Sequence, residues 1–178
     1  LHRPLADLLA ISNYNPIQLA IDCPLESEDA SIVYNIHYPL KDILLSLPNL
    51  QNARLYHSGK FLIDYGKINS KEDEIYINLM HQKLEVCILH KGDFIFYNLF
   101  ETKTKEDFLF YILYTLNQLN ISPNNVSLFA FGDLLNSPEY YETLKKYIRN
   151  VSFNNDDKQL GQYFTLYKLF ECELFQEH

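Results

Sequence analysis

The sequence predicts an α/β fold with a mixed sheet and helices on both of its faces. Two observations favour this fold class. Three segments with alternating apolar residues follow one another between residues 74 and 100, which indicates a meander of antiparallel strands. After them, segments with apolar residues at helical spacing alternate with short apolar runs, a pattern typical of helices that connect parallel strands.

The meander contains two turns with a histidine in each. His81 begins the first turn, and His90 begins a second turn that also contains Gly92. Histidines in turns are more often exposed than bound to a metal, and no cysteine or acid lies beside them at a metal-ligand spacing. We therefore expect no metal site there. The predicted strands of the meander are residues 74–80, 84–88 and 94–100.

A helix follows the meander. Thr104 is a good N-cap, and Asp107 three residues later gives a variant of the capping box. Phe108, Ile112 and Leu116 then form one apolar face at helical spacing. The sequence therefore predicts a helix from about residue 105 that packs on the sheet.

The rest of the chain alternates between strands and helices. Val126–Phe131 is wholly apolar, as in a strand that is buried on both faces. Ser137 is expected to cap a helix that has Pro138 at its first position and runs to about residue 148. A short strand at 151–153 and a closing helix at 162–174 complete the order. Three strands followed by helix, strand, helix, strand and helix is the RNase H-like topology, the half-unit that is repeated in actin-like ATPases.

The first part of the chain has weaker patterns. Ser58 and Gly59 resemble the turn of a hairpin, with strands on either side. Pro48 is expected to end a short helix. The predicted elements are a turn or two of helix at 5–11, strands at 17–21 and 31–38, a helix at 41–47, and a hairpin with strands at 53–57 and 61–65.

Composition excludes several classes of protein. The net charge of -8 repels phosphate backbones and disfavours nucleic-acid binding. No apolar run is long enough for a transmembrane helix, so no membrane association is expected. Cys23, Cys87 and Cys172 are far apart and odd in number, which fits reduced thiols in the cytoplasm. Aromatic residues are abundant, with 14 Tyr and 12 Phe.

Two stretches carry a family resemblance. Asn98-Leu99-Phe100-Glu101, followed by residues 106–113, resembles a signature of an uncharacterised Bacteroidota family, domain of unknown function 3822. Residues 146–151 and 56–59 are similar to other parts of that family. The resemblance implies an actin-like ATPase fold without an established activity. Members are usually longer, and this chain begins at Leu1, so it implies an incomplete first lobe at 1–72 and an RNase H-like second lobe at 73–178.

The resemblance also implies where a nucleotide would bind, and the residues there depart from the pattern. Actin-like ATPases hold phosphates with hairpins that carry Asp and Gly, because glycine lets backbone N–H groups approach the phosphates. Asn78 stands where the Asp is expected, and no glycine follows it. Gly132 and Asp133 stand where a glycine pair would contact adenosine. These three residues are weak candidates for binding ATP and magnesium, and we expect no catalytic residue.

A nuclease of the same topology would need acids that hold two metal ions. Asp133 is a plausible ligand by position, although a turn or helix-entry role is the simpler interpretation. Asn78 carries no charge, and the meander is expected to offer no other inward acid. We therefore do not expect nuclease activity.

Two hypotheses about function follow. The first is a non-catalytic scaffold that binds another protein through aromatic side chains, with Tyr140, Tyr141 and Tyr147 as candidates. Core packing is the alternative role for at least one of them. The second is a degenerate nucleotide-binding protein whose site needs the rest of the first lobe.

Overall fold

The computed structural model describes residues 18–27, 29–50, 53–153 and 161–174. The chain divides into two compact units, with the boundary between Lys60 and Phe61. The sequence analysis expected a boundary after residue 72. The division comes earlier because the helix that contains Phe61 packs its Tyr65 on the sheet of the second unit, against Tyr76 and Phe131. The expected helical turns at 5–11 lie outside the described residues.

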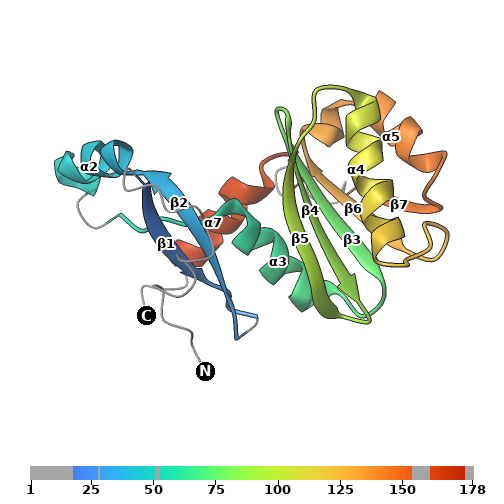
Figure 1. Cartoon of the computed structure of the whole chain (residues 1–178), viewed down its shortest axis with the longest axis horizontal. Helices are drawn as coiled ribbons and strands as arrows, with labels where there is room; N and C mark the ends of the chain where they lie inside the picture. Colours follow the sequence, from blue (N-terminus) through green and yellow to red (C-terminus); the bar gives the residue numbers. More distant parts are fainter. Residues whose placement is uncertain (1–17, 28, 51–52, 154–160, 175–178) are drawn as a thin grey trace. The chain divides into compact units, whose positions relative to one another are not determined.

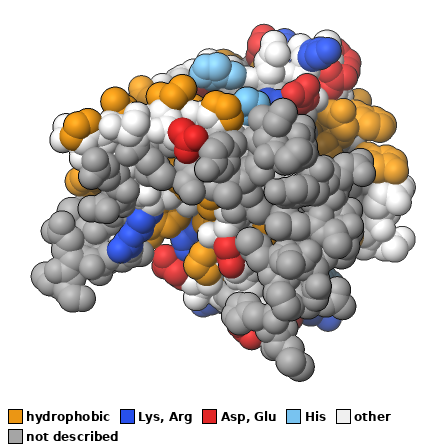
Figure 2. Space-filling model, turned by 60° about the vertical axis from the view of Figure 1, so that its left-hand side comes forward, with side chains coloured by type: hydrophobic (Ala, Val, Ile, Leu, Met, Phe, Trp, Pro, Cys, Tyr) orange, Lys and Arg blue, Asp and Glu red, His pale blue; other side chains and the backbone are white. Residues whose placement is uncertain are grey.

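The first unit contains two strands and a helix. Strand β1 (Gln18–Pro24) pairs antiparallel with β2 (Ser31–His37), and helix α2 (Tyr38–Ser46) and the short helix η1 (Pro48–Leu50) follow. The predicted strands and helix are confirmed. Leu40 and Ile43 on α2 and the C-cap residue Leu47 are exposed. Figure 2, which brings forward the side that carries α2 in Figure 1, shows hydrophobic side chains at the surface among charged ones.

The second unit is built on a five-stranded sheet with the order β5-β4-β3-β6-β7. Strands β3, β4 and β5 form the predicted antiparallel meander, and β6 and β7 run parallel to β3. The predicted mixed sheet is therefore confirmed. The strands are β3 (Glu74–Met80), β4 (Lys83–His90), β5 (Asp93–Glu101), β6 (Ser127–Gly132) and β7 (Asn150–Phe153).

Helices cover both faces of this sheet. Figure 1 shows α4 and α5 on one side of the sheet and α3 and α7 on the other. Within the described ranges, no helix is long and apolar enough to cross a membrane. The helices are α3 (Ser58–Asn69), α4 (Lys105–Gln118), α5 (Pro138–Lys145) and α7 (Phe164–Leu174), with the short helix η2 (Asp133–Asn136) after β6.

The capping predictions had different outcomes. The Asp107 N–H donates to Thr104 Oγ1 at 3.0 Å, and the Thr104 N–H donates to Asp107 Oδ2 at 3.1 Å, so the capping box of α4 is confirmed. Ser137 occupies the N-cap of α5, but its side chain makes no capping hydrogen bond. Its hydroxyl lies 3.3 Å from the Asp133 carbonyl oxygen, to which it donates.

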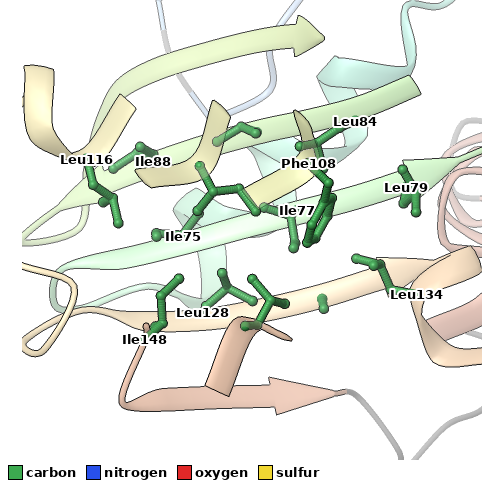
Figure 3. Close-up of a cluster of buried hydrophobic side chains, with 14 of the residues drawn as sticks. Ile75, Ile77, Leu79, Leu84, Ile88, Phe108, Leu116, Leu128, Leu134 and Ile148 are labelled. Atoms are coloured by element: carbon green, nitrogen blue, oxygen red, sulfur yellow. The ribbon is translucent and has the colours of Figure 1, made fainter. Parts of the chain in front are cut away.

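The main core lies between the sheet and the α4/α5 layer. Alternate residues of β3, β4 and β6 point into it, as the two-residue period of a strand requires. Phe108 and Leu116 of α4 pack onto these strand residues and are fully buried. Figure 3 shows that the contributing side chains converge from three strands and from the helices above them.

The predicted hairpin at 53–65 is wrong, because Ser58–Asn69 is the helix α3. The hairpin was predicted from Ser58-Gly59 as its turn, but these two residues begin α3. Lys60, Asp64 and Lys67 stand at helical spacing, and this signal was overlooked because Lys60 and Asp64 are isolated polar residues in an otherwise apolar segment.

Candidate functional site

The residues singled out in the sequence lie at one end of the five-stranded sheet. Strand β3 ends at Met80 and turns at His81, while β6 ends at Gly132 and continues into η2 at Asp133. A pocket of about 300 Å³ lies between these two turns and the start of α7. We refer to it as the turn pocket. Its wall is mostly apolar, with side chains of Leu79, Met80, Tyr163, Phe164 and Leu166.

Asp133 ties the two turns together. Its Oδ2 accepts a hydrogen bond of 2.6 Å from the backbone N–H of His81 and lies 3.6 Å from His81 Nδ1. The His81 backbone has a left-handed φ of 58°, which is uncommon for a residue with a side chain. A phosphate group at this turn would need that N–H as a donor. The Asp133 carboxylate already occupies the donor and adds negative charge where the phosphate would sit.

Gly132 has a structural reason to be glycine. Its φ is 77°, and a Cβ placed on it would lie 2.2 Å from the Leu79 carbonyl oxygen and 2.6 Å from Asn78 Oδ1. The end of β6 therefore approaches β3 too closely for any side chain at this position. The close approach that glycine allows is used for contact between strands.

Asn78 belongs to a buried hydrogen-bond network. Its Nδ2 donates to Glu85 Oε2 at 2.8 Å and to Thr165 Oγ1 at 3.1 Å. The Tyr97 hydroxyl donates to the other Glu85 oxygen at 2.8 Å. Asn78 and Glu85 are direct partners on β3 and β4. The amide of Asn78 is therefore engaged inside the protein.

Glu85 corrects the expectation that the meander holds no other inward acid. It is fully buried on the face of the sheet that α3 and α7 cover. One signal could have revealed it. Glu85 lies between Leu84 and Val86, so it must face away from the main core, and the predicted fold already had helices on that second face. Burial raises the pKa of the Cys87 thiol on the same face, and the charge of Glu85 raises it further.

The two turn histidines have different surroundings. The His81 side chain is almost wholly exposed, and its Nδ1 lies 3.6 Å from Asp133 Oδ2. His90 is half-exposed, and its Nδ1 lies 2.8 Å from Asp73 Oδ1. In the part of the chain that the structure describes, no group of three or more histidine, cysteine and acidic side chains is arranged to hold a metal ion.

The three candidate tyrosines do not form one surface. Tyr140 packs edge-on against Phe108 at a centroid distance of 4.9 Å and belongs to the margin of the main core. The Lys145 ammonium lies over the ring of Tyr141, 4.3 Å from its centroid. Tyr147 is exposed. Of the three, Tyr147 is the most accessible to a partner.

A different exposed surface adjoins the turn pocket. Tyr163, Leu166 and Phe170 are between 56% and 66% exposed, and their spacing places them on one side of the α7 segment. We call them the α7 stripe. Tyr163 and Leu166 also line the turn pocket, so the stripe and the pocket are continuous. The sequence analysis noted the apolar content of this helix but did not separate its buried side from its exposed side.

Comparisons with known proteins give a family and a similar solved structure. The family described as "Protein of unknown function (DUF3822)" matches residues 14–151. A crystal structure from Bacteroides thetaiotaomicron, described as a protein with actin-like ATPase fold and unknown function, is similar with a TM-score of 0.79 and 21% sequence identity. The match covers 94% of this chain and 65% of that chain. No curated protein matches the sequence.

Proposed function

We propose a function from one premise: this chain belongs to the DUF3822 family of proteins of unknown function, and it has an actin-like ATPase fold. In our proposal the protein is a non-catalytic, cytoplasmic interaction module. It binds another protein at the surface formed by the turn pocket and the α7 stripe. It does not act on nucleic acid or on a membrane.

The hydrogen bond from the His81 N–H to Asp133 is the observation that carries this proposal. An actin-like fold that used ATP would offer free backbone donors at this turn. Here the donor is occupied by a carboxylate, and the neighbouring Asn78 amide is bonded to Glu85 and Thr165. The groups available to a ligand at the pocket are mainly apolar.

The surface suggests the chemistry of the partner. Exposed Tyr, Leu and Phe side chains beside an apolar pocket suit a partner that inserts an apolar side chain. Asp133 at the pocket margin is half-exposed, and the chain carries a net charge of -8. A basic residue next to the inserted side chain would therefore be favoured.

Selection from a library of random short peptides tests the proposal directly. We expect selected peptides to combine an apolar anchor with Lys or Arg. Their affinity should fall about tenfold or more for Leu166→Glu and for Phe170→Glu, since both changes place a charge in the apolar contact. Both side chains are exposed, so thermal unfolding should change little.

Tyr147→Glu is the matched control, because Tyr147 is similarly exposed and is not part of the turn pocket. We expect it to bind the peptides normally. If Tyr147→Glu abolished binding while Phe170→Glu did not, the interaction surface would instead lie at the end of α5. If no peptide depended on either region, the interaction proposal would fail.

A degenerate nucleotide-binding protein is the second candidate. The position of the turn pocket favours it, since the pocket lies where β3 and β6 end and where the resemblance places the phosphates and adenosine. In that case ATP with magnesium would displace Asp133 from the His81 N–H. Calorimetry with Mg-ATP separates the two candidates.

A further inference from the structure

A second pocket lies at the opposite end of β3 and has a different chemical character. Its volume is about 310 Å³, and it is lined by Asp73, His90, Ile95, Leu119, Asn120, Ile121, Ser122 and Asn125. We call it the His90 pocket. Asp73 immediately precedes β3, whereas the turn pocket lies where β3 ends, so the length of a seven-residue strand separates the two sites.

His90 is held in a fixed orientation at this pocket. Asp73 Oδ1 lies 2.8 Å from His90 Nδ1 and also accepts the backbone N–H of Lys91 at 3.1 Å. A proton on Nδ1 satisfies the carboxylate, so the neutral imidazole presents Nε2 as a hydrogen-bond acceptor. Both side chains of the pair remain partly accessible to solvent.

The opposite wall is a turn that carries neutral hydrogen-bonding side chains. Asn120 ends α4 with a left-handed φ of 56°, and its N–H donates to the Asn117 carbonyl at 3.1 Å. The Asn125 N–H donates to the Ser122 carbonyl at 3.0 Å. Backbone bonds thus hold the turn in place. The side chains of Asn120, Ser122 and Asn125 supply two amides and a hydroxyl, which can both donate and accept.

The charged residues that line the His90 pocket disfavour an anionic ligand. Among the described residues that line the pocket, Asp73 and His90 are the titratable ones, and none is Lys or Arg. A phosphate or carboxylate would face the Asp73 carboxylate without a permanent cation to pair with. Ile95, Leu119 and Ile121 add apolar contact for a carbon skeleton. The combination suits a neutral molecule with several hydroxyl groups.

We propose that the His90 pocket binds a small neutral polyhydroxylated molecule of about the size of a hexose. The volume of about 310 Å³ lies at the lower end of the roughly 300–1,000 Å³ that small-molecule sites span, so the pocket can accommodate a hexose. Asn amides pair with adjacent hydroxyls, and His90 Nε2 accepts from a third. This site is independent of the interaction surface proposed above.

A titration of the full chain, followed by its backbone amide NMR signals, tests the proposal with two probes. Glucose is the neutral probe, and glucuronate is its anionic counterpart. We expect glucose to shift the signals of His90, Asn120, Ser122 and Asn125 with a Kd of about 1–10 mM. Glucuronate should bind at least about tenfold more weakly, because it faces Asp73.

Variants identify the residues responsible. His90→Leu and Ser122→Ala should each weaken glucose binding, the first by about tenfold, and the thermal unfolding of each variant shows whether it is folded. His81→Leu is the matched control, since His81 lies in the turn at the other end of β3, and it should bind glucose normally. The proposal is overturned if glucose shifts none of these signals at about 100 mM, if glucuronate binds more tightly than glucose, or if His81→Leu causes the same loss as His90→Leu.

Discussion

The two faces of the five-stranded sheet differ in what they bury. The face under α4 and α5 buries apolar side chains such as Ile77, Val86 and Phe108. The face under α3 and α7 buries Asn78 and Glu85 together with aromatic rings. Buried polar side chains need partners inside the protein, and on the second face Asn78 and Glu85 are partners of each other.

The two faces therefore contribute differently, one mainly to the stability of the fold and the other to the arrangement of residues beside the turn pocket. The apolar face supplies most of the hydrophobic free energy, because it removes whole strands and helices from water. The polar face links β3 to its neighbours beside the turn pocket, since the Asn78 amide donates hydrogen bonds to Glu85 on β4 and to Thr165 on α7. We therefore expect substitutions on the first face to change stability, and substitutions on the second face to change the turn pocket as well.

The largest effect is expected on the apolar face. Phe108→Ala should lower the free energy of unfolding by about 3–5 kcal/mol, because Phe108 is fully buried and its removal leaves a cavity. Phe110→Ala is the matched control on the same helix, since Phe110 is 57% exposed. Urea unfolding of both variants checks the prediction. Equal losses would mean that α4 does not pack on the sheet through Phe108.

Gly132→Ala should have the next largest effect on the free energy of unfolding. Gly132 is the last residue of β6. The added Cβ would clash with the Leu79 carbonyl oxygen, and the left-handed backbone is strained for alanine. We expect a loss of about 2–4 kcal/mol in urea unfolding. Gly92→Ala has a similar φ but a nearest contact of 3.3 Å, so its loss should be smaller. A larger loss for Gly92→Ala would contradict the close approach of β6 to β3.

The sequence predicts most of the fold where residues contrast in polarity. Glu74–Met80 and the helix from Lys105 were predicted because each has one apolar face, and both are confirmed. Ser58–Asn69 was not, because Ser58-Gly59 resembled the turn of a hairpin. The helical spacing of Lys60, Asp64 and Lys67 was the signal that could have revealed the helix.

The site could be predicted only in part. Asn78, Gly132 and Asp133 were singled out together, and the structure brings them to one pocket because β3 and β6 are parallel neighbours. The bond between Asp133 and the His81 N–H depends on the left-handed backbone of His81, which its sequence does not signal. Glu85 was missed because its face of the sheet was treated as outside the core.

A smaller effect is expected from Glu85→Ala on the polar face. It would leave the Asn78 amide and the Tyr97 hydroxyl without this acceptor, at a cost of about 1–3 kcal/mol. Glu85→Gln should cost less, because its oxygen can accept from Asn78 while its NH₂ donates to the Tyr97 oxygen. Thermal unfolding of the pair measures the difference. If Glu85→Gln cost as much as Glu85→Ala, the network would depend on the negative charge and not on hydrogen bonding.

The smallest effect concerns the thiols. The raised pKa of Cys87 keeps this buried thiol protonated, so a thiol reagent should reach it only when the protein unfolds, while the partly exposed Cys172 should react early. Because the folded state holds this proton more tightly, the stabilising contribution is complete below the ordinary thiol pKa and is lost as pH rises above about 8.5. Peptide mapping of the labelled protein checks the order. Equal labelling rates at Cys87 and Cys172 would show that the α3/α7 face is open.

Titration calorimetry with Mg-ATP tests most directly whether the Asp133 carboxylate prevents a nucleotide from binding at the turn after β3. With the His81 N–H bonded to a carboxylate, we predict no binding heat up to about 1 mM nucleotide. A magnesium-dependent Kd of about 1 μM would contradict the account, because it would require Asp133 to release the turn and Mg-ATP to take its place.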